Sequence, residues 1–407
     1  MKRAFLAAAL AGSLAGCGTR APDALLPVSA QAVGATRVPI LVATTRKALP
    51  GEPGLLFGGE RSHHVSYRRI DVSIPPAHRV GEVEWPDSSP GDPARHFVTL
   101  RSDPLNDAGL HSSVREMVRR SGQRRVLVFV HGYNNQFDDA VFRFAQIKHD
   151  SRAPGVAVLF TWPSRGRLLA YPYDRESATY SRTALERLLT ELSAEPAITD
   201  IDVLAHSMGN WVTLEALRQQ AIRKGRVPAK IRNVMLAAPD IDLDVARTQV
   251  QDLGPNRPKI TLFVAQDDRA LAFSRLFWGS NVQLGAIDPE VEPYRSSLAK
   301  ANITAVDLTR MRSGDPLHHA TFAESPEVVR SIGARLVAGQ TVGQDESLGE
   351  GIGLVVGGAA RSLGAAATAA VSVPAAVVDP ASRRNLEETF RAIVPGAHDP
   401  REDVATD

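Results

Sequence analysis

The chain has 407 residues, of which 43% are hydrophobic and 23% are charged, and these values are typical of globular proteins. Its 47 basic residues nearly balance its 45 acidic ones, which argues against a protein that mainly binds nucleic acid. The single cysteine excludes an intrachain disulfide framework and a cysteine-based zinc cluster. After the first twenty positions there is no apolar run of about 18 residues, so the sequence does not predict a polytopic membrane protein.

The amino terminus has the features of a secretory signal. Lys2 and Arg3 precede a short apolar run and small residues, so we expect residues 1–16 to be removed. The segment Leu14–Cys17 resembles the lipobox of bacterial lipoproteins, which implies cleavage before Cys17 and acylation of its thiol. Several acyl chains would anchor the protein stably. By the same resemblance, Gly18 favours the outer membrane, facing the periplasm. The alternative is an ordinary signal with a chance cysteine.

Two segments differ in composition from the rest of the chain. Residues 17–36 are small, polar and proline-bearing, and we expect a flexible tether. Residues 340–407 begin as a Gly/Ala-rich tail, in which Arg361 and Pro374 interrupt a four-residue glycine spacing. For this tail we favour a loosely ordered or surface-lying segment over a membrane-inserted hairpin.

From residue 37 to about 105 the sequence is strand-like. Short β-prone runs, VPILVATT, VSYRRIDVSIP, GEVEWP and HFVTLR, are separated by Gly, Pro and Asp-Ser clusters. We expect them to form antiparallel edge strands, an amino-terminal β extension at 37–105.

The chain then alternates between apolar runs and helical patterns. The apolar runs are almost continuous, as in strands buried on both faces of a parallel sheet, and lie at 126–130, 156–162, 201–207, 231–239, 259–266 and 303–309. Helical patterns lie at 106–121, 137–149, 174–194, 208–224, 242–252, 269–277 and 326–338. This order predicts an α/β domain at 37–339 with a doubly wound, mostly parallel sheet and functional loops at the carboxyl ends of the strands.

The segment Ala205–Gly209 (AHSMG) follows a predicted buried strand and precedes a predicted helix. This is the context of a nucleophile elbow, a sharp turn that lifts a serine above the sheet in a strained conformation. The residues two positions before and after Ser207 must be small, and Ala205 and Gly209 are. Ser207 is therefore the candidate nucleophile, and the helix amino end beside it favours developing negative charge.

Two adjacent acids and two adjacent histidines follow in later loops. Asp267 and Asp268 directly follow the predicted strand at 259–266, and a carboxylate there can reach a histidine on the next loop. We prefer Asp268, which lies further out on the turn, and keep Asp267 as the alternative; either can instead cap the next helix. Asp240 and Asp242, after the preceding strand, are weaker rivals.

His318 and His319, after the last strand, are the candidate bases, and spacing does not separate them. His131 precedes the elbow, so we expect it to fix its loop by a backbone hydrogen bond. Zinc at His63-His64 or His318-His319 is disfavoured, because adjacent histidines point apart and no metal-binding motif accompanies them. We predict no metal and no cofactor.

The segments VHGYNNQFDDAV, TWPSRG, YPYDRESATYSRTAL, LAHSMGNW and QDDRAL resemble an uncharacterised bacterial branch, a domain of unknown function, of the α/β-hydrolase esterase/lipase superfamily. The resemblance covers about residues 38–338, with Ala205 for the usual glycine and His318 where glycine is commoner. It implies the chain order Ser207, Asp268, His319 for a catalytic triad. It also implies that the amides of Tyr133 and Met208 form the oxyanion hole.

Together these features predict a lipid-anchored serine hydrolase of the cell envelope that cleaves small-molecule or lipid esters. The alternatives are an acyltransferase with the same triad and a non-catalytic envelope adaptor that retains the fold. We expect no nucleic-acid partner.

Overall fold

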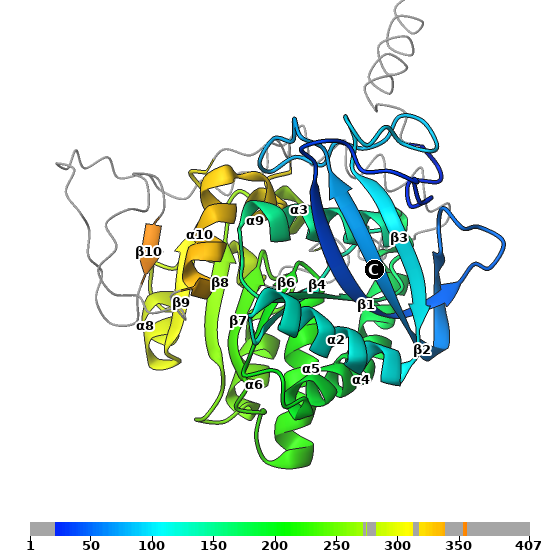
Figure 1. Ribbon diagram of the computed structural model, residues 1–407. Coiled ribbons are helices and arrows are strands. Elements are labelled where there is room, and N and C mark those ends of the chain that lie inside the picture. Colours follow the sequence, from blue (N-terminus) through cyan, green and yellow to red (C-terminus); the bar gives the residue numbers. More distant parts are fainter. Residues whose placement is uncertain (1–20, 272–273, 275–281, 312–316, 338–352, 356–407) are drawn as a thin grey trace, which may run out of the picture. The chain divides into compact units, whose positions relative to one another are not determined.

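A mixed sheet with strand order β10-β9-β8-β7-β6-β4-β5-β1-β2-β3 organises the chain in the computed structural model (Figure 1). The strands are β1 (Thr36–Ala48), β2 (Phe57–Ile74), β3 (Val98–Leu105), β4 (Arg125–Val130), β5 (Val156–Thr161), β6 (Asp200–His206), β7 (Ile231–Ala237), β8 (Lys259–Val264), β9 (Ile303–Asp307) and β10 (Gly353–Val355). Along the sheet, the pairs from β9 through β8, β7, β6, β4 and β5 to β1 are parallel. Strands β2, β3 and β10 are antiparallel to their neighbours. The predicted fold class is confirmed.

The structure describes residues 21–271, 274, 282–311, 317–337 and 353–355. All of them belong to one compact unit. The predicted signal, Cys17 and nearly all of the predicted tail at 340–407 lie outside the described residues.

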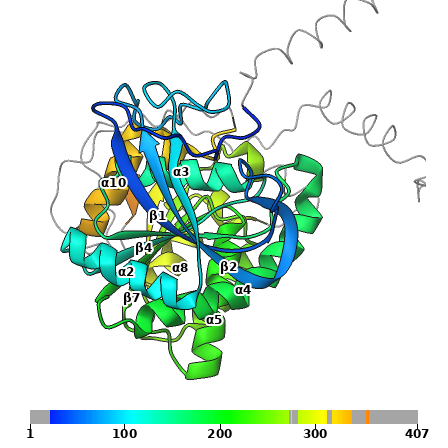
Figure 2. The same cartoon turned by 45° about the vertical axis from the view of Figure 1, so that its right-hand side comes forward.

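Helices cover both faces of the sheet. They are α2 (Asp107–Ser121), α3 (Phe137–Asp150), α4 (Tyr171–Ala194), α5 (Gly209–Lys224), α6 (Leu243–Asp252), α8 (Tyr294–Lys300), α9 (Thr321–Glu324) and α10 (Pro326–Val337), with 3-10 turns η1 (Leu168–Ala170) and η2 (Leu284–Ala286). Figures 1 and 2 show α3 and α10 on one face and α2, α4 and α5 on the other.

Strand β4 illustrates why both faces need a helical layer. Val126, Val128 and Val130 belong to the core beneath α2, α4, α5 and α6, whereas Leu127 and Phe129 belong to the core beneath α3, α9 and α10. All five side chains are at most 1% exposed. Successive side chains of a strand point to opposite faces, so the continuous apolar run requires cover on both.

The amino-terminal extension is continuous with the main sheet. Strand β1 pairs in parallel with β5 and antiparallel with β2, so it joins the parallel core directly rather than forming a separate edge hairpin. Part of the segment expected to be a tether also packs on the domain. Leu25 is fully buried, and the amide of Val28 donates to the carbonyl of Thr99 at 2.8 Å.

Candidate active site

Ser207 occupies the sharp turn between β6 and α5. Its φ is +52°, in the left-handed region that costs a non-glycine residue about 1–2 kcal/mol. The turn is held by its backbone, since the Ser207 amide donates to the carbonyl of Ala237 at 2.9 Å, and the side chain is buried. A Cβ on Gly209 would lie 2.4 Å from the carbonyl oxygen of His131, which explains the glycine there. Ala205 fits, fully buried, where the family usually has glycine.

The loop after β4 approaches Ser207 closely. A Cβ on Gly132 would lie 2.7 Å from the Cβ of Ser207 and 2.8 Å from Nδ1 of His206, so only a glycine allows this contact. Tyr133 follows directly in that loop, and Met208 follows the serine. Among the described residues, neither of these two backbone amides has a hydrogen-bond acceptor. Two N–H donors are therefore available, one in the loop after β4 and one in the turn that follows Ser207.

Asp268 and His319 form a hydrogen-bonded pair. Nδ1 of His319 donates to Oδ2 of Asp268 at 2.7 Å, while Oδ1 of Asp268 accepts from the amide of Leu271 at 3.0 Å. One carboxylate thus orients the imidazole and also caps the segment that follows. The Asp268 side chain is 0% exposed and the His319 side chain 15%, so most of the pair is shielded from water.

His206, the residue before the nucleophile, places this pair beside the elbow. Its ring lies 4.7 Å from the ring of His319, centroid to centroid, and 4.6 Å from that of Phe322. Burial lowers the pKa of His206 well below its usual range, so the ring is neutral. Its Nε2–H donates to the backbone carbonyl of His319 at 3.1 Å, which ties the histidine loop to the end of β6.

The alternative residues form a second, more exposed pair. Nδ1 of His318 donates to Oδ2 of Asp267 at 2.7 Å, with side chains 39% and 41% exposed. The two histidines, which sequence spacing does not separate, thus differ in how far they are exposed to solvent.

The two rival acids serve other roles. Asp240 accepts from the hydroxyl of Tyr171 at 2.6 Å. Asp242 accepts the amides of Asp244 and Val245 at the start of α6.

A buried arginine, which no sequence motif marks, supports the loop after β4. Arg46, on β1, donates to the carbonyls of Asn135 and Ser164, both at 2.8 Å, and to the hydroxyl of Thr161 at 2.8 Å. Burial, opposed by nearby acids such as Asp174, lowers its pKa to about 10, so it stays charged at neutral pH. An arginine in a β-prone run such as VATTRKA gives no signal that it faces inward.

His131 has the role expected for it. Its Nδ1–H donates to the carbonyl of Gly132 at 2.8 Å, and its Nε2 accepts from the amide of Trp162 at 3.1 Å. Burial and the charge of Arg46 lower the pKa of His131 to about 3, so the ring is neutral. It fixes the backbone of the loop that lies against Ser207.

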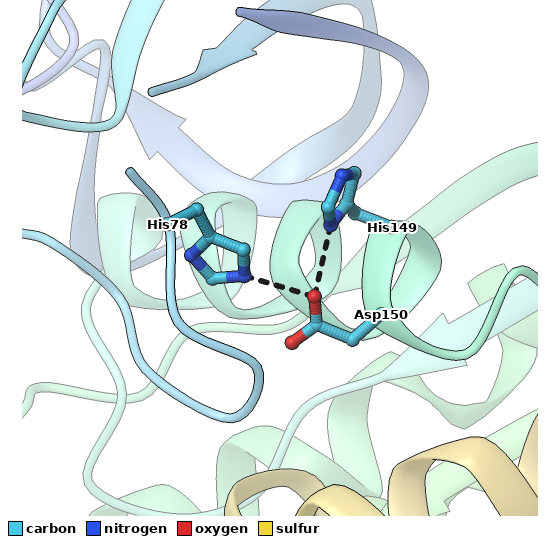
Figure 3. A group of neighbouring side chains, drawn as sticks. All are labelled: His78, His149 and Asp150. Atoms are coloured by element: carbon cyan, nitrogen blue, oxygen red, sulfur yellow. Dashed lines mark hydrogen bonds and ion pairs between the residues drawn. The ribbon is translucent and has the colours of Figure 1, made fainter. Parts of the chain in front are cut away.

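Within the part of the chain that the structure describes, one group of side chains has metal-ligand character, and the sequence motifs do not predict it. His78, His149 and Asp150 place their ligand atoms within 4.8 Å of one another (Figure 3). His78 donates from Nε2 to Asp150 at 2.8 Å and from Nδ1 to Glu84 at 2.7 Å. Burial disfavours the charged ring, but these two carboxylates outweigh it and raise the pKa of His78 to about 9. At neutral pH the ring is therefore an imidazolium that forms ion pairs with both carboxylates.

The parallel sheet flanked by helices, with a strained serine between β6 and α5, is the architecture of the α/β-hydrolase superfamily. Residues 106–337, more than half of the chain, match the family described as "Alpha/beta hydrolase of unknown function (DUF900)", and the chain belongs to this family. The membership of the α/β-hydrolase superfamily that the sequence motifs predict is thus confirmed.

Individual relatives are distant. The uncharacterized protein alr1448 of Nostoc sp. is 26% identical where the two align, over 29% of this chain and 38% of that protein. The chain therefore spans less than half the length of this curated relative. An esterase of Pyrobaculum calidifontis is 12% identical with a TM-score of 0.32, covering 67% of this chain and 81% of that one. A Rhizomucor miehei esterase is 12% identical with a TM-score of 0.33, covering 73% and 83%.

None of the helices in the described part of the chain combines the length and the apolar character needed to cross a membrane.

Proposed function

We propose that this protein is a serine hydrolase that cleaves carboxylic esters, with Ser207 as nucleophile, His319 as general base and Asp268 as the residue that orients the histidine. The observation that carries the proposal is the shielded Asp268–His319 hydrogen bond beside the strained Ser207 turn. A strained backbone of this kind persists where the surrounding structure enforces it, and such sites concentrate at catalytic centres.

The proposed reaction proceeds through an acyl-enzyme. His319 takes the hydroxyl proton of Ser207 as Oγ attacks the ester carbonyl, and Asp268 stabilises the imidazolium that forms. His319 then gives the proton to the departing alkoxide, which leaves as the alcohol. Water, activated by the same histidine, attacks the acyl-enzyme and releases the acid and the free serine.

The tetrahedral oxyanion would rest on the amides of Tyr133 and Met208. Their lack of acceptors among the described residues supports this role, because such donors cost no reorganisation when charge develops. The close approach of Gly132 to the Cβ of Ser207 supports it too.

The experiment that tests the proposal uses the mature chain and p-nitrophenyl esters of increasing acyl length. We expect turnover of at least one ester and covalent labelling by a fluorophosphonate probe. Both should be lost in Ser207→Ala, with a nearly unchanged thermal midpoint. Activity or labelling that survives Ser207→Ala would remove the nucleophile. Labelling without hydrolysis, together with acyl transfer to an added alcohol, would identify an acyltransferase.

The location of the enzyme is a separate part of the proposal. The lipobox-like segment supports a protein anchored by acyl groups on Cys17, at the outer membrane and facing the periplasm. Metabolic labelling with radioactive palmitate tests it. We expect incorporation into the full chain and none into Cys17→Ser. Equal labelling of the two proteins would exclude the anchor.

A further inference from the structure

A cleft of about 1040 Å³ lies at the amino ends of the parallel strands, away from the proposed active site. It is lined by the starts of β1 and β5 and by the last turns of α2 and α3. Ser207 follows the carboxyl end of β6. In a parallel sheet the amino and carboxyl ends of the strands are separated by the length of a strand, about 20 Å for six residues. The cleft is therefore not part of an ester subsite.

The lining of this cleft is strongly cationic. It contains six lysine and arginine side chains, one histidine, His149, and one carboxylate, that of Glu116. The basic residues are Arg37, Arg69, Arg101, Arg120, Lys148 and Arg152.

Four of these cations are paired with three carboxylates, and two of the carboxylates each bind two arginines. Asp71, fully buried, accepts from both Arg37 and Arg69. Glu116 likewise serves Arg69 at 3.3 Å and Arg120 at 2.7 Å. Arg101 pairs with Asp103. Six cations thus face three carboxylates, and each shared guanidinium keeps N–H donors that its acid does not use.

Two of the cations have no acid partner. Lys148, in the last turn of α3, donates to the carbonyl of Ala153, and Arg152 follows that helix. Within the described ranges, neither makes an ion pair with a carboxylate. Burial lowers the pKa of Lys148 to about 8.

Arg152 has a left-handed backbone conformation. Its φ is +52°, a conformation that asparagine and glycine adopt more readily than arginine does. Arg152 directly follows Ser151, the C-cap of α3, so this conformation ends the helix and leaves an arginine without an acid partner in the same cleft lining as Lys148.

We propose that this cleft binds a phosphate-bearing anion, with Lys148 and Arg152 as its principal contacts and the spare donors of Arg69 and Arg120 completing the site. Guanidinium forks match phosphate oxygens in bidentate geometry, and a phosphate group carries the multiple negative charge that the excess of cations requires. The site does not depend on the esterase activity.

Isothermal titration of the mature chain with inorganic pyrophosphate and with glycerol 3-phosphate tests the proposal. We expect saturable, salt-sensitive binding of at least one of them. Preference for pyrophosphate would indicate a free phosphate compound, and preference for glycerol 3-phosphate a lipid headgroup. Absence of binding of both would overturn the proposal.

The double variant Lys148→Met/Arg152→Asn should raise the Kd about tenfold or more, since charge-assisted hydrogen bonds are lost. Neither change leaves a buried carboxylate unpaired, and asparagine tolerates the backbone of residue 152. Arg167→Met is the matched control, because Arg167 is exposed and follows the carboxyl end of β5, at the opposite end of the strands. Arg120→Glu, at a side chain 71% exposed, reverses one charge independently and should also weaken binding. Binding unchanged in the double variant and in Arg120→Glu would refute the assignment, as would equal weakening by the control.

Discussion

The guanidinium of Arg46 donates from Nη2 to the carbonyl oxygen of Asn135 at 2.8 Å, and this bond joins the first strand of the sheet to the loop that lies against Ser207. The same side chain also reaches Ser164 and Gly58, so one residue of the amino-terminal extension holds three backbone segments in place. The extension is thereby part of the scaffold of the proposed active site.

Replacing this arginine should affect both stability and activity. Arg46→Met keeps much of the side-chain volume but leaves buried carbonyls without donors, at a cost of about 1–3 kcal/mol for each. We expect a loss of at least about 3 kcal/mol in the free energy of unfolding, measured by urea denaturation, and a lower kcat for ester hydrolysis. Lys47→Met, at the exposed neighbour on β1, is the control and should change stability by less than about 0.5 kcal/mol. Equal effects of the two variants would contradict the role of Arg46.

Asp268 and Asp267 offer a matched pair of substitutions. Asp268→Asn keeps the shape but removes the charge that stabilises the His319 imidazolium, so kcat for ester hydrolysis should fall roughly a thousandfold or more. Asp267→Asn disrupts only the exposed pair with His318 and should change kcat by less than about threefold. The measurement is steady-state hydrolysis of the best p-nitrophenyl ester. The reverse order of effects would move the triad to Asp267 and His318.

Gly132 sets how closely its loop approaches the nucleophile. In Gly132→Ala the new methyl would overlap the Cβ of Ser207 and the ring of His206, so the loop must move and the Tyr133 amide with it. Loss of one oxyanion donor slows acyl transfer about a hundredfold or more. We expect that loss in kcat, with KM changed much less. Gly51→Ala, where a Cβ would meet no atom within 4 Å, should be kinetically silent. A fully active Gly132→Ala would exclude Tyr133 from the oxyanion hole.

The ion pairs of His78 with Glu84 and Asp150 predict a pH dependence of stability. The pKa of His78 is about 9 in the folded chain, because its two carboxylate partners outweigh the effect of burial, and about 6.5 in the unfolded chain. The stabilisation is therefore fully present below about pH 6.5 and is lost as the pH rises through about 9. Urea denaturation at pH 6 and pH 10 should show a loss on the order of 2 kcal/mol that is absent in His78→Gln.

The control for this prediction is His63→Gln, at an exposed histidine of β2, which should retain the wild-type pH profile. An unchanged profile in His78→Gln would show that the ring is not charged in the folded protein.

Local signals were sufficient for the central sheet. The apolar runs at 126–130 and 201–207 correspond to β4 and β6, because a strand buried on both faces has to be apolar throughout. The elbow was recognisable because small residues are sterically required on both sides of Ser207. By contrast, GEVEWP was expected to be a strand but is irregular, since the Glu84 carboxylate turns back to bond His78 and the amide of Arg79.

The remaining features depend on contacts between distant parts of the chain. Helix α8 (Tyr294–Lys300) was not predicted, because its seven residues make only about two turns, too few for a helical period to be recognised. Nothing in the sequence marks Arg46 as buried, and only the fold shows that Asp268 and His319 are shielded whereas Asp267 and His318 are exposed. The charge excess of the basic cleft is equally invisible, because its residues come from β1, β2, β3, α2 and α3.

The parallel pairing of β1 with β5 has a practical consequence for anyone who shortens the gene. A fragment cut at the family boundary, residue 106, would begin after β3 and would lack Arg46. It would also expose the backbone of β5 along a bare apolar margin, which is a template for aggregation. Expression plasmids should therefore start upstream of residue 21, so that the recombinant product keeps the strands that seal this flank.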